Sequence, residues 1–187
     1  MTETLSLFFA LLGFGGVFAI VGVLGLLAAA TFGNSAGARR LLDDIAPLGF
    51  VLGTIAATTA MAGSLYYSEV ANFNPCRLCW VQRYFMYPSA LILLASLFGG
   101  QRFRRFGWVA VGLSVVGFGV AVYHRLEQQF PDTVGGSCAL DNPCSGRYVD
   151  QFGFMTIPTM AAIAFALVFT FVSLNLRHSS SVSITQE

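Results

Sequence analysis

The sequence predicts an all-α membrane protein: a four-transmembrane-helix bundle with one extra transmembrane helix ahead of it. Of the 187 residues, 56% are hydrophobic and only 10% are charged, whereas charged residues make up about a quarter of a soluble domain. The mean hydropathy is +0.71. Five apolar segments are long enough to qualify, since a helix needs roughly 20 residues to cross a bilayer. The net charge of +1 offers no basic surface for nucleic acid, so no such partner is expected.

The first apolar segment covers about residues 7–32 and, with the loop after it, forms a unit of residues 1–44. Its apolar run is longer than the roughly 7–15 residues of a signal-peptide core, and only Glu3 precedes it as a charge. It is therefore predicted to be a retained spanning helix. A cleaved signal remains the alternative, because small residues follow at 35–38.

The other four segments cover about residues 45–67, 80–98, 106–123 and 156–176, and they form a predicted core of residues 45–177. Residues 178–187 are expected to be a cytoplasmic tail. Gly49 and Gly53 are spaced to let two helices approach closely, although glycine is also simply common in membrane helices.

The arginines predict the orientation. They cluster after the first, third and fifth segments, at Arg39 and Arg40, at Arg102, Arg104 and Arg105, and at Arg177. Five spans put these clusters on one side, and positively charged loops stay in the cytoplasm. We therefore expect a multi-pass protein of the bacterial cell membrane, with its N-terminus outside and its C-terminus inside. All four cysteines then lie on the extracytoplasmic side, where disulfides persist.

Cys76 and Cys79 form a Cys-x-x-Cys pair in the outer loop before the third span. Such a pair can close a disulfide that opens readily. Cys79 lies in the first turn of the predicted helix, whose free N–H groups favour a thiolate there. The thiolate is the nucleophile of disulfide exchange, so this pair is the first candidate for redox chemistry.

Arg83 follows Cys79 by four residues, on the same helix face and about 6 Å deeper. One interpretation is an anchor whose side chain reaches up to the lipid headgroups. Positive charge is disfavoured on this side of the membrane, which favours a functional role in holding a thiolate or the charge on an electron acceptor. A lipid-soluble quinone is a suitable two-electron acceptor at this depth. Trp80, Tyr84 and Phe85 could line its pocket, but aromatic residues are also ordinary at membrane interfaces.

Cys138 and Cys144 form a second pair in a turn-rich outer loop with Pro143 and Gly146. Their disulfide is either a structural staple or a shuttle between a soluble protein and the first pair. Zinc bound by the four cysteines is a further reading. The five-residue spacing of the second pair and the oxidising compartment disfavour it, so no metal is predicted.

Three stretches together resemble bacterial disulfide bond formation proteins of the DsbB/BdbC type: "PCRLCWVQRYFMYP", "YHRLEQ" and the loop with the second cysteine pair. The resemblance covers about residues 45–176, and the short spacing of the second pair is closer to the BdbC branch. It implies a four-helix bundle that reoxidises a thioredoxin-fold dithiol oxidase (DsbA/BdbD-like) outside the cytoplasm. The electrons would pass to a membrane quinone, either ubiquinone or menaquinone.

The resemblance also implies a role for each sulfur. Cys138 receives the cysteine of the partner oxidase in a mixed disulfide, and Cys144 then attacks Cys76. Cys79 is left as the thiolate that faces the quinone, with Arg83 beside it.

His124 and Gln128, four residues apart at the outer end of the fourth span, match the family's polar pair near the quinone. The chain departs from the family in its extra first segment. It also has Gln82 where some relatives have an acidic residue, which puts a charge partner for Arg83 in doubt. The vitamin K epoxide reductases share the chemistry but place their loop cysteines ahead of the Cys-x-x-Cys, and the order here is the reverse.

The sequence therefore predicts a membrane thiol:quinone oxidoreductase that supports disulfide bond formation. Two alternatives remain open. One is a non-catalytic membrane scaffold with two static disulfides, and the other is an enzyme that delivers reducing electrons outward.

Overall fold

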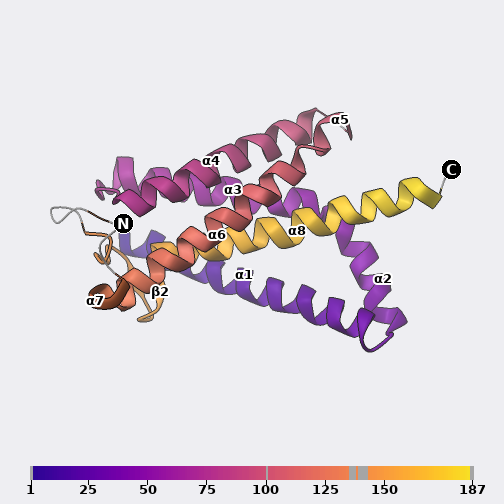
Figure 1. Cartoon of the computed structure of the whole chain (residues 1–187), viewed down its shortest axis with the longest axis horizontal. Coiled ribbons are helices and arrows are strands. Elements are labelled where there is room, and N and C mark those ends of the chain that lie inside the picture. Colours follow the sequence, from indigo (N-terminus) through magenta and orange to yellow (C-terminus); the bar gives the residue numbers. More distant parts are fainter. Residues whose placement is uncertain (1, 100, 135–137, 139–142, 186–187) are drawn as a thin grey trace.

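The computed structural model describes residues 2–99, 101–134, 138 and 143–185. The regular secondary structure of this part is helical apart from one short hairpin (Figure 1). The helices are α1 (Thr2–Thr31), α2 (Ala36–Ile45), α3 (Gly49–Leu65), α4 (Arg77–Phe98), α5 (Gln101–Arg104), α6 (Gly107–Gln129), α7 (Pro131–Val134) and α8 (Ile157–Thr185). A 3-10 turn (Ala46–Leu48) precedes α3 and a π-helical turn (Tyr66–Val70) follows it. Strands β1 (Asp150–Gln151) and β2 (Met155–Thr156) pair antiparallel.

Four stretches of helix in the described residues are long and apolar enough to cross a membrane: Glu3–Thr31, Ala36–Val70, Gly107–Gln129 and Ile157–Ser180. They indicate a multi-pass membrane protein. The predicted third span is helical, as α4, but it is not among the four. Gln82, Arg83 and Pro88 make this helix less apolar than the others. The count of five spans and the orientation therefore stay predictions.

The helices run back and forth, so that the loops gather at two opposite ends of the molecule. The N-terminus, α7 and β2 lie at one end, and α2, α5 and the C-terminus lie at the other (Figure 1). We call the first the cysteine end, because Cys76 and Cys144 meet there in one buried cluster.

Helix α2 was expected only as a loop that carries Arg39 and Arg40. Ser35 caps it by accepting a hydrogen bond from the Ala38 N–H at 3.3 Å. Leu42 is buried in a cluster with Val23 of α1 and Phe171 of α8. The helix forms because its apolar residues recur on one face. By packing on both α1 and α8, this face joins the end of α1 to the bundle.

Helices α3, α4, α6 and α8 surround the main core, which includes Phe50, Leu93, Phe165 and Val168. The expected close approach at the two glycines is confirmed for α3 and α8. A Cβ at Gly49 would lie 2.4 Å from the backbone oxygen of Phe171, and one at Gly53 would lie 2.4 Å from Val172 Cγ2. Only glycine fits at Gly49, since a backbone atom cannot move aside.

Two helices run further than the sequence predicted. Helix α6 ends at Gln129 rather than at residue 123, so His124 and Gln128 lie within it. Helix α8 continues to Thr185 and takes in most of the predicted tail, whose residues 186–187 lie outside the described part.

Candidate functional site

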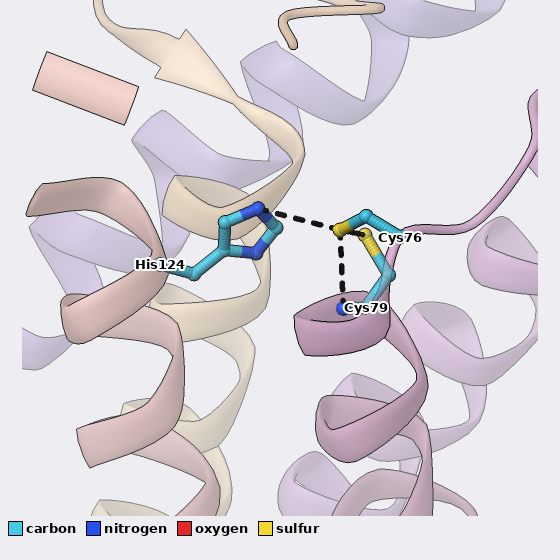
Figure 2. Close-up of side chains that lie close together, drawn as sticks. All are labelled: Cys76, Cys79 and His124. Atoms are coloured by element: carbon cyan, nitrogen blue, oxygen red, sulfur yellow. Dashed lines mark hydrogen bonds between the residues drawn. The ribbon is translucent and has the colours of Figure 1, made fainter. Parts of the chain in front are cut away.

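Cys76 is the N-cap of α4, and its sulfur accepts a hydrogen bond from the backbone N–H of Cys79 at 3.4 Å. The two sulfurs lie 3.0 Å apart, and both cysteines are free thiols (Figure 2). The extended backbone of Cys76 turns its side chain back over the first turn of the helix. The helix terminus that was expected to favour a thiolate at Cys79 therefore acts on Cys76.

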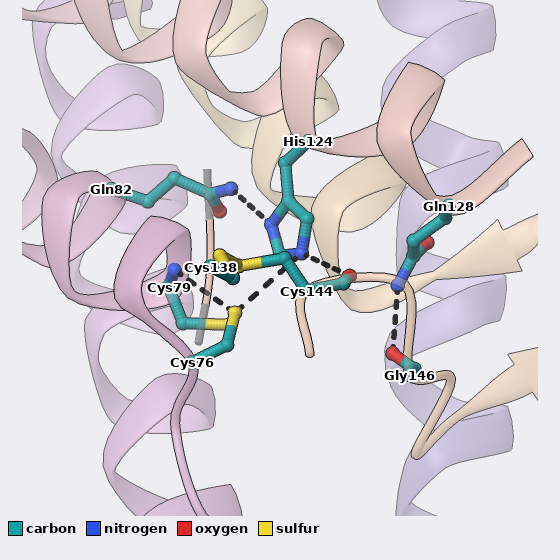
Figure 3. The surroundings of a disulfide bond; sticks show 8 residues. All are labelled: Cys76, Cys79, Gln82, His124, Gln128, Cys138, Cys144 and Gly146. Carbon is teal, nitrogen blue, oxygen red and sulfur yellow. Dashed lines mark hydrogen bonds between the residues drawn. A yellow bond between two sulfur atoms is a disulfide. The ribbon is translucent and has the colours of Figure 1, made fainter. Parts of the chain in front are cut away.

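His124 lies between the two cysteine pairs. Its Nε2 is 3.7 Å from Cys76 Sγ and 3.1 Å from the backbone oxygen of Cys144 (Figure 3). On its other side, the amide nitrogen of Gln82 lies 2.9 Å from Nδ1. Because an amide nitrogen only donates, the proton of the neutral ring must sit on Nε2. From there it can be donated to the Cys144 oxygen or the Cys76 sulfur.

These contacts make the reduced pair asymmetric. The hydrogen bond from the Cys79 thiol, reinforced by His124, outweighs burial and lowers the pKa of Cys76 to about 4. Negative charge in the reduced pair therefore resides on Cys76, whereas the sequence placed it on Cys79. The signal that was missed is the N-cap position itself, since the side chain that precedes a helix receives its free N–H groups.

Cys138 and Cys144 form a disulfide, with their Cα atoms 5.7 Å apart. Cys144 belongs to the buried cluster of Cys76 and Leu78, and Cys79 and Cys138 pack against this cluster (Figure 3). The structure thus brings all four cysteines together, as the sequence predicted. The rest of the loop around Cys138, at 135–137 and 139–142, lies outside the described residues.

Hydrogen bonds of Gln128 hold the second cysteine loop against α6. Its amide nitrogen donates to the Gly146 oxygen at 3.1 Å, and Arg147 donates to the Gln128 backbone oxygen at 3.1 Å. His124 and Gln128 were expected beside a quinone. In the structure, both contact the segment that carries Cys144, and their contact with a quinone stays a prediction.

Arg83 does not reach the headgroups as an anchor would, because it is only 9% exposed. It donates from Nε to the Ser64 hydroxyl and from Nη2 to the Ser64 backbone oxygen, both at 3.0 Å. Its guanidinium lies 5.0 Å from the centre of the Trp80 ring. No carboxylate of the described residues pairs with it, in keeping with Gln82 in the acidic position.

A groove of about 810 Å³ runs between α1, α3, α4 and α8. Cys79, Gln82 and Arg83 line it at the cysteine end, and the described residues around it do not include Cys76, His124 or Gln128. Cys79 thus borders the groove as well as the cysteine cluster, whereas Cys76 is buried in the cluster with Cys144. Of the expected aromatic residues, Tyr84 is 70% exposed and Phe85 packs on the core, so the rings in the groove are others, such as Tyr67 and Tyr87.

Glu127 is a residue of this site that the sequence did not suggest. It is 3% exposed, and a carboxylate oxygen lies within 4.8 Å of the sulfurs of Cys138 and Cys144. Its Oε2 has no hydrogen-bond partner among the described residues. The spacing to His124, three residues along one helix, could have indicated that Glu127 also faces the cysteines.

Two groups could supply metal ligands by distance alone. Cys76, Cys79 and His124 bring their donor atoms within 4.8 Å of one another, as do Glu127, Cys138 and Cys144. The disulfide leaves the second group without a thiolate ligand. The zinc reading with four cysteine ligands does not fit this arrangement.

Comparisons with known proteins match this site to one family. The family described as "Disulfide bond formation protein DsbB" matches residues 47–175. Disulfide bond formation protein C of Bacillus subtilis is 43% identical over 122 residues, which are 64% of this chain and 86% of the relative. A probable disulfide formation protein of Oceanobacillus iheyensis is 42% identical over 125 residues, 66% of this chain and 85% of the relative.

A more distant relative, a probable disulfide formation protein of Deinococcus radiodurans, is 37% identical over 132 residues, 65% of this chain and 84% of the relative. No solved structure gives a significant match. The family match includes both cysteine pairs, Arg83, His124 and Gln128, whereas α1 lies outside it. The chain therefore belongs to the DsbB family of disulfide bond formation proteins.

Proposed function

We propose that the chain is a membrane thiol:quinone oxidoreductase. It reoxidises a thioredoxin-fold dithiol oxidase outside the cytoplasm and passes the electrons to a membrane quinone. The observation that carries this proposal is the arrangement of the four cysteines. Cys76 meets the second disulfide in a buried cluster, while Cys79 faces a groove large enough for a small-molecule ligand.

The relay begins at the second pair. A thiolate of the partner attacks Cys138, the Cys138–Cys144 bond breaks, and its electron pair leaves on Cys144. Cys144 then attacks Cys76 in the oxidised first pair, which releases Cys79 as a thiolate. The partner's second thiol displaces Cys138, so that the partner departs with a disulfide. Cys138 attacks Cys144 to restore the second pair and releases Cys76.

The residues of the groove fit a quinone as the electron acceptor. The groove is apolar along its length, and its cysteine end carries the cation of Arg83 and the hydroxyl of Ser64. Closing the Cys76–Cys79 disulfide would give the quinone two electrons and the proton of the Cys79 thiol, because Cys76 is already a thiolate. The second proton that the reduced quinone needs comes from water. Arg83 attracts the negative charge of the Cys79 thiolate and orients an anionic headgroup oxygen.

The environment of Cys76 supports the direction of flow. A pKa of about 4 stabilises the reduced pair as a thiolate. A dithiol whose reduced form is stabilised makes a more oxidising disulfide, as in DsbA. The first pair is thereby suited to accept electrons from a strongly oxidising partner.

In this proposal helix α4 also crosses the membrane, which brings the number of spans to five. Its 22 residues extend about 33 Å, enough for a hydrocarbon core of about 30 Å. The cysteine end then faces outward and the Arg39–Arg40 end faces the cytoplasm of a bacterial cell, with α1 and its loop forming the added unit 1–44.

The test uses the purified full chain, a reduced thioredoxin-fold dithiol and a quinone analogue. We expect thiols to be lost only when both enzyme and quinone are present, and Cys79→Ser to abolish the turnover. Absence of quinone-dependent thiol loss would end the proposal. Trapping of thiols in cells separates the alternatives, because a scaffold keeps both disulfides closed and an outward reductase keeps its cysteines reduced.

A further inference from the structure

Helix α1 lies outside the family match, yet it forms one wall of the groove. Its lining residues recur along one face and include Phe8, Phe9, Leu12, Gly16 and Ala19. Without α1, the groove between α3 and α8 would open along its whole length to lipid. The extra helix therefore changes the shape of the very site that faces Cys79.

Helix α1 is firmly attached on the α8 side. A Cβ at Gly16 would lie 2.9 Å from side-chain atoms of both Ile163 and Leu167, so the two helices meet closely there. Near the cysteine end, Gln151 donates a hydrogen bond to the Ser6 hydroxyl at 3.1 Å. The ring of Phe14 packs edge-on against Phe154 of the hairpin, with centroids 5.6 Å apart. These contacts make α1 a fixed wall.

On the α3 side, α1 reaches across only through side chains. The ring of Phe9 lies 3.1 Å from the Cβ position of Gly63 and its centroid is 6.0 Å from that of Tyr67. Further along, α3 presents Leu52, Ala56 and Ala60 to the groove, and α8 contributes Leu167 and Phe171. The groove is thus polar at Cys79 and Arg83 and apolar over the rest of its length.

We propose that α1 encloses a binding channel for the isoprenoid tail of the quinone, and that the enzyme therefore selects quinones with long tails. The argument rests on the proposed function, which places the quinone headgroup at Cys79. A molecule with a redox headgroup and a long apolar chain matches a groove that is polar at one end and apolar beyond it. Small residues such as Ala19 and Ala60 leave the room that the chain occupies.

The experiment fills the channel from α1. Ala19→Trp places a bulky ring in the groove, whereas Val21→Trp, on the same helix at a side chain 61% exposed and outside the groove, is the matched control. The ratio of kcat/KM for a long-tailed quinone to that for a tail-less quinone with the same headgroup is measured for the full chain. We expect this ratio to fall about tenfold in Ala19→Trp, with tail-less turnover kept, and to hold in Val21→Trp.

If Ala19→Trp leaves this ratio unchanged, the groove does not bind the quinone tail and the proposal is wrong. The same conclusion would follow if both tryptophan variants lowered the ratio equally, because the effect would then not come from the groove. Failure of the proposed function looks different, since even the tail-less quinone would then oxidise no thiol. The two failures are therefore distinguishable.

A second inference rests on a different observation, the buried carboxyl of Glu127. An unpaired polar atom in a buried position is costly, and this one lies within 4.8 Å of both sulfurs of the second disulfide. Neither Cys138 nor Cys144 can donate to it while they are joined. Once the disulfide opens, a Cys144 thiol becomes available as its partner.

We infer that Glu127 exchanges one proton with Cys144 during the relay of the proposed function. When the partner's thiolate attacks Cys138, the electron pair of the broken bond leaves on Cys144, and the carboxylic acid of Glu127 supplies a proton. When Cys144 attacks Cys76, the Glu127 carboxylate takes that proton back. One proton thus moves out and returns, and the buried thiolate exists only at the moment of attack.

The test is Glu127→Gln, which keeps the shape of the side chain but cannot exchange the proton. Rapid mixing with a reduced dithiol substrate follows the mixed disulfide at Cys138 and its resolution through Cys144. We expect at least tenfold slower resolution, within the range of general acid–base effects, with the KM for quinone unchanged. The control is Asp132→Asn, at an exposed carboxyl of α7 near the same end.

Resolution at the wild-type rate in Glu127→Gln would overturn this role. A raised KM for quinone would also contradict it, because Glu127 would then act at the groove. Thiol counting of the resting variant confirms that the Cys138–Cys144 disulfide still forms, so a slow rate cannot be attributed to loss of the fold. Formation of the mixed disulfide should slow as well, because Glu127 supplies the proton to Cys144 in that first step.

Discussion

The ring of His124 lies 3.7 Å from the sulfur of Cys76, on the side that faces the second disulfide. Since the same nitrogen also faces the Cys144 oxygen at 3.1 Å, one imidazole links the two cysteine pairs. A quinone contact was the expected role of His124. That contact stays a prediction, while the structure places the ring where it can hold the Cys76 thiolate beside the Cys144 segment.

The first prediction concerns the titration of Cys76 in the reduced protein. Because its pKa is lowered to about 4, the thiolate is present above that pH and is lost only as the pH falls through it. Alkylation of Cys76 should therefore stay fast at pH 5–6, where an ordinary thiol with a pKa of about 8.5 hardly reacts. His124→Ala should raise the pKa, since it removes one hydrogen bond. If the alkylation rate of Cys76 in the wild type instead had its midpoint near the ordinary thiol pKa, this prediction would be wrong.

The second prediction separates the two halves of the reaction at Arg83. Arg83→Met removes the cation from the groove, so the KM for quinone should rise about tenfold or more, consistent with the loss of a charged hydrogen bond. Thiol exchange with the partner should keep its rate, because the second disulfide lies on the other side of Cys76. The KM of Arg83→Lys for quinone should lie between those of the wild type and Arg83→Met. Lysine keeps the charge but loses the paired hydrogen bonds to Ser64. A KM for quinone in Arg83→Met equal to that of the wild type would contradict a role of Arg83 in quinone binding.

The third prediction concerns helix packing. Gly49→Ala forces a methyl group against the Phe171 backbone, and overpacking of this kind typically costs about 1–3 kcal/mol. Gly112→Ala is the control, because nothing lies within 4 Å of its Cβ position and alanine favours the helix. Thermal unfolding in detergent should show a lower melting temperature for the first variant only. Equal melting temperatures would mean that α3 and α8 are not this close.

The fourth prediction identifies the partner. In Cys144→Ala the second disulfide cannot form, so Cys138 stays free to hold a partner protein in a mixed disulfide. Cells that express this variant should contain a covalent adduct that reducing agent dissolves, and mass spectrometry then identifies the partner. The double variant Cys138→Ala/Cys144→Ala should show none. An adduct that persists in the double variant would show that another cysteine meets the partner.

Much of this architecture was predictable because hydrophobic periodicity is a local signal. The ranges of the apolar segments, the close approach at Gly49 and the meeting of both cysteine pairs followed from the sequence. Helix α2 and the last turns of α6 were missed, since amphipathic ends such as the one with His124 look like loops to a hydropathy criterion. The Gln82–His124 bond and the location of the thiolate depend on tertiary contacts between α4 and α6, which no local pattern encodes.

The central claim is that electrons pass from the second cysteine pair to the first by a direct bond between Cys144 and Cys76. The double variant Cys79→Ser/Cys138→Ser leaves only these two cysteines in the chain. Mild oxidation of the purified variant, followed by proteolysis and mass spectrometry, should find a Cys76–Cys144 disulfide within one chain. Two free thiols after oxidation, or bonds between chains only, would contradict the relay.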